Sequence, residues 1–400
     1  ASSYLSASGV LGTGDVIFEI RPGTYNGQVL INASLVNNNT IIFQSSTGRA
    51  SDVTIAATPT NLKNYVFLVD GMKNVIFKNL TFKNNATSTS LAGNGLVVNN
   101  GNNIKVDYCN FYGVASSPRN EAYTNLLFNN TDKVFVTNSI ILNGANGITN
   151  AGTVKITNSL FDNNIISDYS WKGIYNNFSM PDNNVVITNN VIRNASNPKP
   201  PYGIASTNGT IINNNLIDGL TGTGTDSKES GIYLMATSTP KEHTEISGNK
   251  IVNIVNANGI FAENTKIKAL NNLINCNPTI GSTMALLNIN NSIGYAGNNV
   301  MNGGNISGFR ATNSPNFYFM YNTVVVNSAS YPAIYTSVNG GTFYRNIFQN
   351  NGTYACTDFW GTLNCNDNNY YLRVSVKYDL NLNNSNPNIL GDNSRCDSPS

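Results

Sequence analysis

Apolar and polar residues alternate in short segments that recur along the chain, and each segment meets a corner rich in asparagine. The segments 134–140, 154–160, 185–191 and 210–216 show this most clearly. A period of two residues is typical of β-strands, because successive side chains then point to opposite faces. The segments are too short for helices. The pattern therefore predicts short strands separated by sharp corners.

An apolar anchor residue follows each corner and recurs at intervals of 20 to 35 residues. Twelve anchors form the series: Leu80, Phe111, Ile140, Leu160, Val191, Leu216, Ile251, Leu273, Val300, Val324, Ile347 and Tyr370. Asparagine stands two residues before nine of them, at Asn138, Asn158, Asn189, Asn214, Asn249, Asn271, Asn298, Asn322 and Asn368. Asparagine tolerates the left-handed backbone of a sharp corner, and stacked amides can bond from coil to coil. We therefore expect an asparagine ladder.

A second repeated element is the pair Gly-Ile, at Gly147, Gly173, Gly203, Gly231 and Gly259, where another short strand begins. Each repeat then holds three strands. The sequence predicts an all-β protein, a single right-handed parallel β-helix of about twelve three-strand coils. A leucine-rich repeat is disfavoured, because leucine is scattered and helical periodicity is absent.

The composition disfavours two roles, nucleic-acid binding and spanning a membrane. Charged residues make up only 11% of the chain, and polarity comes instead from 74 asparagines. The net charge is +2 with no basic run, which disfavours nucleic-acid binding. No apolar stretch is long enough for a membrane span.

We expect one domain over residues 1–400. Residues 1–35 would form an N-terminal cap with a short helix and the first coils, residues 65–372 the regular coils, and residues 373–400 a truncated closing segment. Cys356 and Cys365 lie in a loop-rich region and predict a disulfide in an oxidising compartment, although five unpaired thiols are the alternative.

The segments 14–20, 22–25, 40–49 and 69–82 resemble the opening of right-handed parallel β-helix proteins that Bacteroidetes secrete to the cell surface, many through the type IX route. The resemblance implies right-handed winding and an extracellular or cell-surface location. That family includes adhesins and carbohydrate-active enzymes, so the resemblance leaves the function open.

Extra chain length falls mostly between the anchor strand and the next Gly-Ile strand, which predicts loops along one edge. These loops carry aromatic and cationic residues suited to stacking on sugar rings. The predicted ligand-binding residues are Tyr112, Arg119, Tyr123, Tyr169, Trp171 and Tyr202. The alternative is that these rings pack the loops against the coils.

Asp162, Arg193 and Asp218 each follow an anchor by two residues on consecutive repeats, which predicts a vertical Asp–Arg–Asp ladder. With Lys172, they are the candidate catalytic residues if the protein is a polysaccharide lyase or a glycosidase. A cation between two carboxylates lowers both pKa values, which disfavours a general acid. A surface ladder of salt bridges is the simpler interpretation.

The sole histidine, His243, is expected to be a solvated turn residue. No metal-ligand spacing appears and no cofactor is expected, although asparagine oxygens could ligate calcium. We weigh three functions. The first is a non-catalytic, adhesin-like or structural surface β-helix that contacts a polysaccharide or cell-surface glycan. The second is a lyase or hydrolase acting on an acidic polysaccharide. The third is a filament subunit that associates through the open β-helix ends.

Overall fold

The computed structural model of the chain divides into two compact units, Ala1–Pro200 and Pro201–Ser400. The residues it describes are 14–32, 39–87, 90, 92–115, 117, 119–152, 157–176, 184–193, 202–222, 226–236, 243–277, 284–337, 340–354, 356–360, 363–366, 368–372, 380–382 and 395–397.

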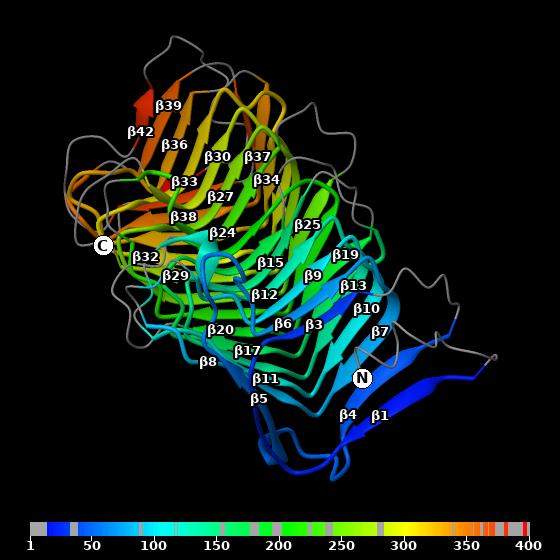
Figure 1. Cartoon of the computed structure of the whole chain (residues 1–400). Coiled ribbons are helices and arrows are strands. Elements are labelled where there is room, and N and C mark those ends of the chain that lie inside the picture. Colours follow the sequence, from blue (N-terminus) through cyan, green and yellow to red (C-terminus); the bar gives the residue numbers. More distant parts are fainter. Residues whose placement is uncertain are drawn as a thin grey trace. The chain divides into compact units, whose positions relative to one another are not determined.

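Three parallel sheets, A, B and C, form the N-terminal unit, and successive strands enter them in turn (Figure 1). Sheet A holds β1 (Val16–Ile20), β4 (Ile41–Ser45), β7 (Lys73–Lys78), β10 (Asn102–Asp107), β13 (Asp132–Thr137), β16 (Leu160–Asp162) and β19 (Val185–Thr188). Sheet B holds β2 (Gly23–Asn26), β5 (Val53–Ala57), β8 (Thr81–Asn84), β11 (Asn110–Tyr112), β14 (Ile140–Leu142), β17 (Ile165–Ser167) and β20 (Val191–Arg193). Sheet C holds β3 (Val29–Asn32), β6 (Phe67–Asp70), β9 (Leu96–Asn99), β12 (Thr124–Asn129), β15 (Asn146–Ala151) and β18 (Lys172–Asn176). Two short 3-10 helices, η1 (Ala50–Asp52) and η2 (Glu121–Tyr123), precede β5 and β12.

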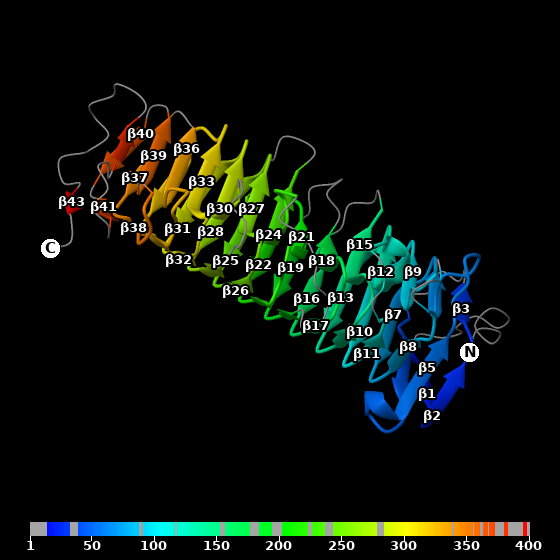
Figure 2. The same cartoon turned by 90° about the vertical axis from the view of Figure 1, so that its left-hand side faces the viewer.

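The C-terminal unit repeats the same three sheets, and its strands lie side by side in order (Figure 2). Sheet A holds β22 (Thr210–Asn213), β25 (Thr244–Ser247), β28 (Lys266–Leu270), β31 (Ile293–Gly297), β34 (Tyr318–Met320), β37 (Gly341–Tyr344) and β40 (Leu363–Asn366). Sheet B holds β23 (Leu216–Asp218), β26 (Lys250–Ile254), β29 (Leu273–Cys276), β32 (Val300–Gly303), β35 (Thr323–Val326), β38 (Ile347–Asn350), β41 (Asn369–Leu372) and β43 (Arg395–Asp397). Sheet C holds β21 (Tyr202–Ser206), β24 (Ser230–Met235), β27 (Asn258–Glu263), β30 (Ala285–Asn290), β33 (Ser307–Thr312), β36 (Ile334–Ser337), β39 (Thr357–Trp360) and β42 (Leu380–Leu382).

The fold is an all-β, right-handed parallel β-helix with three strands per coil, which confirms the predicted fold class. The described strands β1 to β42 make fourteen sets of three, two more than the twelve anchors, because β2 and β5 precede Leu80. No α-helix occurs within the described ranges. The expected capping helix falls in residues 1–13, outside them, and only β42 and β43 of the expected closing segment lie inside them.

Strand alternation builds the core, as the period of two predicts. In sheet A of the N-terminal unit, paired inward positions on three successive coils are all fully buried: Val75 and Phe77, Ile104 and Val106, Val134 and Val136. Burying each such side chain contributes roughly 1.5–3 kcal/mol. The same register continues from coil to coil within each unit, so the core of each unit is a stack of aliphatic and aromatic side chains.

The corner between sheets A and B turns at a residue with positive φ, usually asparagine. Asn138, Asn163 and Asn189 have φ of 52°, 54° and 55° on successive coils. Asparagine reaches this left-handed region more easily than most residues. The sequence-based explanation of the corner is therefore confirmed for these coils.

The residue immediately after the turn carries the asparagine ladder. In the C-terminal unit its members are Asn215, Asn249, Asn272, Asn299, Asn322, Asn346 and Asn368, all buried. Each Nδ2 donates to the Oδ1 of the next member at 2.8 to 3.1 Å, and the backbone N–H donates to that same oxygen. In the N-terminal unit Asn164 and Asn190 make the same pair. The ladder thus satisfies buried backbone groups that water does not reach.

The predicted ladder mixed two different positions. Asn249, Asn322 and Asn368 are ladder members, whereas Asn138 and Asn298 are turn residues one position earlier, the first half-exposed and the second exposed. The prediction at Asn158 is wrong for a second reason, because Leu160, the anchor that follows it, lies in sheet A opposite Phe135. The turn of that coil is instead at Asn163, which donates to Asn138. Asn158-Ser-Leu and Asn163-Asn-Ile look alike and lie five residues apart, so the alignment slipped by one strand.

The repeated glycines at the start of sheet C have a steric reason. A Cβ on Gly231 would lie 2.7 Å from Ile251 Cγ2 and 2.8 Å from the carbonyl oxygen of Gly259 on the next coil. Gly147 meets the carbonyl of Gly173 in the same way. Successive coils therefore approach each other too closely here for any side chain.

Several long connections lie between sheets B and C, as predicted, including residues 85–95, 113–123 and 219–229. The segment 162–172, which the sequence pattern also predicts to be such an insertion, instead contains β17. No helix within the described parts of the chain is long and apolar enough to cross a membrane.

Candidate functional site

The outer face of sheet C in the C-terminal unit gathers half-exposed polar side chains in a line. The register places Glu263, Asn290, Thr312 and Ser337 opposite one another on β27, β30, β33 and β36. All four are half-exposed. Strands of a sheet are about 4.8 Å apart, so these side chains form an evenly spaced line, here called the polar row.

Aromatic rings and a guanidinium border the polar row. Tyr202 stacks on Tyr233 with ring centroids 5.1 Å apart, and Tyr233 stacks on Phe261 at 5.6 Å. Farther along, the guanidinium of Arg310 lies 4.5 Å above the ring of Tyr335. Tyr233 and Phe261 are buried, whereas Tyr202 and Tyr335 are half-exposed. The accessible rings therefore lie at the two ends of this border.

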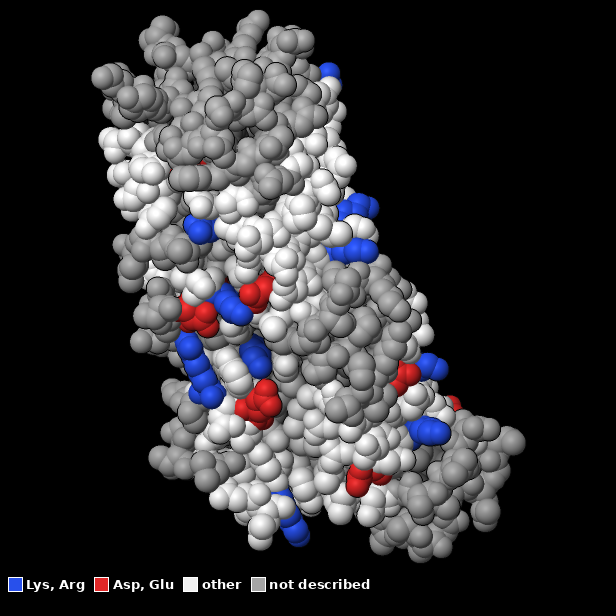
Figure 3. Space-filling view, turned by 90° about the horizontal axis from the view of Figure 1, so that it is seen from above, with Lys and Arg blue, Asp and Glu red and all other residues white. Residues whose placement is uncertain are grey.

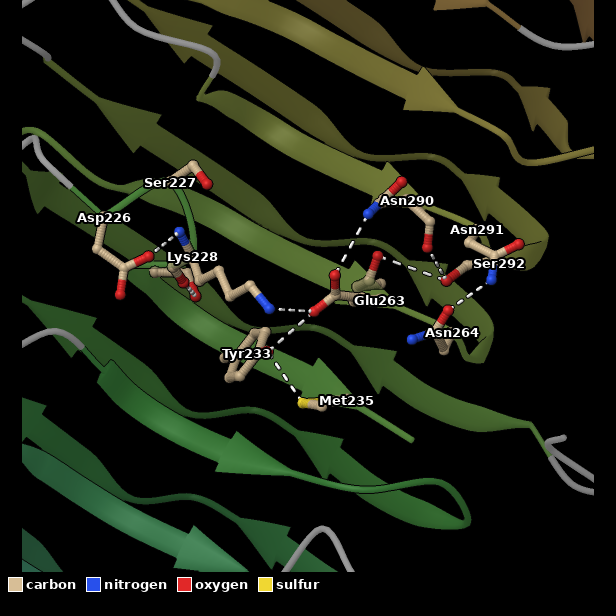
Figure 4. Close-up of polar contacts among 12 residues, drawn as sticks. Asp226, Ser227, Lys228, Tyr233, Met235, Glu263, Asn264, Asn290, Asn291 and Ser292 are labelled. Atoms are coloured by element: carbon tan, nitrogen blue, oxygen red, sulfur yellow. Dashed lines mark hydrogen bonds and ion pairs between the residues drawn. The ribbon is translucent and has the colours of Figure 1, made fainter. Parts of the chain in front are cut away.

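The carboxylate of Glu263 is the centre of a polar network (Figure 4). It accepts the Lys228 Nζ at 2.7 Å, the Tyr233 hydroxyl at 3.2 Å and the Asn290 Nδ2 at 3.3 Å. The Asn290 Oδ1 accepts from the Thr312 hydroxyl at 3.1 Å. The network extends along the polar row and fixes the orientation of its first three members.

The Tyr233 hydroxyl is set up to donate. Burial raises the pKa of Tyr233, and the neighbouring Glu263 carboxylate raises it further. The phenol therefore keeps its proton at neutral pH, which excludes Tyr233 as a general base there. Lys228 neutralises Glu263, so the network resembles a binding surface more than an acid–base pair.

A second arrangement, in the N-terminal unit, surrounds Lys172. Its Nζ lies 3.8 Å from the centre of the Trp171 ring and 3.7 Å from that of Tyr175. The Nζ also lies 3.5 Å from the Glu121 carboxylate. Burial lowers the pKa of the Lys172 ammonium, and Glu121 offsets part of this. With a side chain only 7% exposed, Lys172 is held between the rings rather than presented to a ligand.

Of the predicted ligand-binding residues, Tyr123 and Tyr169 do not fit the prediction, because each is only 1% exposed. Tyr123 packs with Val114 and Ala145, and Trp171 lies half-buried against this cluster. These rings hold loops against the coils, which is the alternative that the sequence left open. Two other predicted residues, Tyr112 at the end of β11 and Arg119 before η2, are exposed. Tyr202 lies at the site described above.

The predicted Asp–Arg–Asp ladder is wrong. Asp162 lies in sheet A opposite Thr188, whereas Arg193 lies in sheet B opposite Ser167. The slip at Leu160 explains the error, because the residue two after that anchor belongs to another sheet. The Asp162 carboxylate accepts from the Asn189 Nδ2 at 2.9 Å.

The other member, Asp218, lies in sheet B of the C-terminal unit opposite Val252. Its carboxylate accepts from the Asn253 Nδ2 at 2.7 Å. Asp162 and Asp218 therefore each accept a hydrogen bond from an asparagine side chain of the next coil, and Lys172 contacts Trp171, Tyr175 and Glu121.

The remaining predictions concern a disulfide, the sole histidine and metal binding. The backbone of Cys365 is described but its side chain is not, so the Cys356–Cys365 disulfide stays a prediction. His243 is exposed. Within the described ranges no three His, Cys, Asp or Glu side chains gather as metal ligands would.

The sequence analysis missed Lys228, Glu263, Asn290, Arg310 and Tyr335. Glu263 and Asn290 belong to the polar row, and Arg310 and Tyr335 each lie two residues before the polar-row member of their own strand. The Gly-Ile pairs end at Gly259, so they mark only the first strand of the polar row, β27, and not β30, β33 or β36. Figure 3 shows one face of the molecule, on which charged side chains are few among uncharged ones.

No protein-family model matches the sequence, and no curated protein matches it significantly. Among solved structures, DFA-IIIase from Arthrobacter chlorophenolicus A6 is similar with a TM-score of 0.48 and 10% identity, over 82% of this chain and 84% of that one. The A-module of a mannuronan C-5 epimerase from Azotobacter vinelandii gives 0.45 and 11%, over 88% and 90%. Pectin methylesterase from Erwinia chrysanthemi gives 0.37 and 15%, over 57% and 74%. Likeness at this level supports no function.

Proposed function

We propose that the protein is a non-catalytic, extracellular surface β-helix that binds a glycan on the outer face of sheet C of its C-terminal unit. The observation that carries the proposal is the polar row bordered by the half-exposed rings of Tyr202 and Tyr335. Sugars present hydroxyl groups at their edges and C–H groups on their faces. A line of amide, carboxylate and hydroxyl groups beside aromatic rings meets both requirements.

The chemistry of the same groups supports binding over cleavage. Inverting or retaining hydrolysis needs two carboxyl groups flanking the bond, one of them protonated. Glu263 is paired with Lys228, and Tyr233 is held protonated by burial. We therefore keep a lyase or hydrolase only as the first alternative function. A filament subunit is the second alternative.

Binding of oligosaccharides by isothermal titration calorimetry tests the proposal. Tyr335→Ala and Asn290→Ala should each weaken binding about tenfold, a loss near 1.4 kcal/mol. Tyr318→Ala is the matched control, because Tyr318 is exposed in sheet A of the same unit and should not matter. Equal binding by all three variants and the wild type would refute the site.

Assays on the same samples separate the alternatives. Reducing ends or unsaturated uronate products released from polysaccharides would show catalysis. Concentration-dependent fibres in light scattering, together with no glycan binding, would favour the filament subunit.

A further inference from the structure

Arg310 differs from the other groups on the outer face of sheet C because it is a cation with no acidic partner among the residues that the structure describes. It lies on β33 between Asn288 of the preceding coil and Tyr335 of the following one. Its side chain is half-exposed and its guanidinium rests on the Tyr335 ring. Asp358 is one coil farther away, beyond Tyr335.

The ion pairs found among the described residues do not include Arg310. They are Arg49–Asp52, Lys172–Glu121, Lys228–Glu263 and Lys268–Glu245. Burial lowers the pKa of the Arg310 guanidinium, and Tyr335 and Tyr331 offset part of this. Removing water from a guanidinium without supplying a counter-charge costs free energy. A ligand that brings an anion would recover this cost.

The surroundings of Arg310 also restrict its orientation. The contact of the guanidinium carbon with the Tyr335 ring, 4.5 Å from its centre, covers one side of the guanidinium and leaves N–H groups for an acceptor in the ligand. A carboxylate accepts two parallel N–H bonds from the edge of a guanidinium. Thr312, two residues along the same strand, belongs to the polar row and adds a hydroxyl beside it.

We infer that Arg310 binds the carboxylate of a uronic acid, so that the glycan held by this face is an acidic one. This inference rests on the proposed function and names its ligand class. Lys228 cannot take the same role, because Glu263 already neutralises it at 2.7 Å. The negative charge of the ligand would therefore lie at the Arg310 end of the polar row.

The test compares uronate-containing oligosaccharides with the same oligosaccharides after reduction of their carboxylates to primary alcohols. Wild-type protein should bind the acidic form about tenfold more tightly, and Arg310→Gln should abolish this difference. Arg310→Lys should keep only a small preference, because an ammonium lacks the two-pronged geometry. Lys268→Gln removes an exposed cation of sheet A and should leave the preference unchanged.

Circular dichroism of each variant verifies that it is folded. Equal binding of acidic and reduced oligosaccharides by the wild type would overturn the carboxylate inference while the proposed glycan-binding function stands. Binding of neither form would overturn both. Tighter binding of sulfated than of uronate oligosaccharides would refute the carboxylate as the recognised group.

Discussion

The Nδ2 of Asn299 donates to the Oδ1 of Asn322 at 2.8 Å, and the backbone N–H of Asn299 donates to the same oxygen at 3.0 Å. The Asn299 Nδ2 also donates to the carbonyl of Ala269 on the preceding coil. One buried carboxamide per coil therefore links three successive coils. Its removal leaves several buried polar groups without partners, and such groups are costly.

Replacing Asn299 by alanine should lower the free energy of unfolding by about 1–3 kcal/mol. The change removes the acceptor of the Asn272 N–H and Nδ2 groups and the donor to Ala269. Urea denaturation followed by circular dichroism measures the loss. The neighbouring Asn298→Gly variant is the control, because Asn298 is an exposed turn residue with φ of 55° that glycine accepts. A variant as stable as the wild type would contradict the role of the ladder.

Alkaline pH should destabilise the protein partly through Tyr233. Its pKa is raised in the folded state, so the stability it contributes is complete below pH 10, the unfolded value, and is lost as pH rises further. Tyr233→Phe should therefore lose less stability than the wild type above pH 10. Thermal unfolding between about pH 8 and 11 measures the difference. Tyr318→Phe, at an exposed tyrosine, should follow the wild type.

Lys172 should show the opposite dependence on pH. Burial lowers its folded pKa below 10.5, so the stability it contributes is present above the unfolded pKa and is lost as pH falls through the lowered value. The free energy of unfolding of the wild type relative to Lys172→Met should therefore increase as pH rises toward 10.5. Denaturation of both proteins at several pH values measures this. A constant difference would show that the ammonium carries no cost between Trp171 and Tyr175.

The fold followed from the sequence because one physical rule repeats in every coil. Alternation recurs in every coil, and the asparagine turn and the glycine near the start of the sheet C strand recur in many of them. The error at Leu160 has the same origin, since two corners of one coil carry nearly the same three residues. Only the register with Phe135 and Val186 decides between them.

The candidate site was harder to predict because its residues do not repeat. Glu263, Asn290 and Thr312 differ in chemistry and are far apart in sequence, yet they occupy one column of sheet C. Loop aromatics such as Tyr169 were more conspicuous, but an aromatic residue in a long loop can serve as well to anchor the loop. Burial separates the two roles, and the sequence does not report it.

The asparagine ladder also has a consequence for how this chain can change length. Asn272 and Asn299 occupy identical positions one turn apart and are separated by 27 residues. A deletion of residues 272–298 would bring Asn299 to the place of Asn272, and Asn249 would still find its acceptor. The duplication or loss of one whole coil therefore keeps the same hydrogen bonds between ladder asparagines. Insertions shorter than a coil would break this pairing unless they lie in the loops.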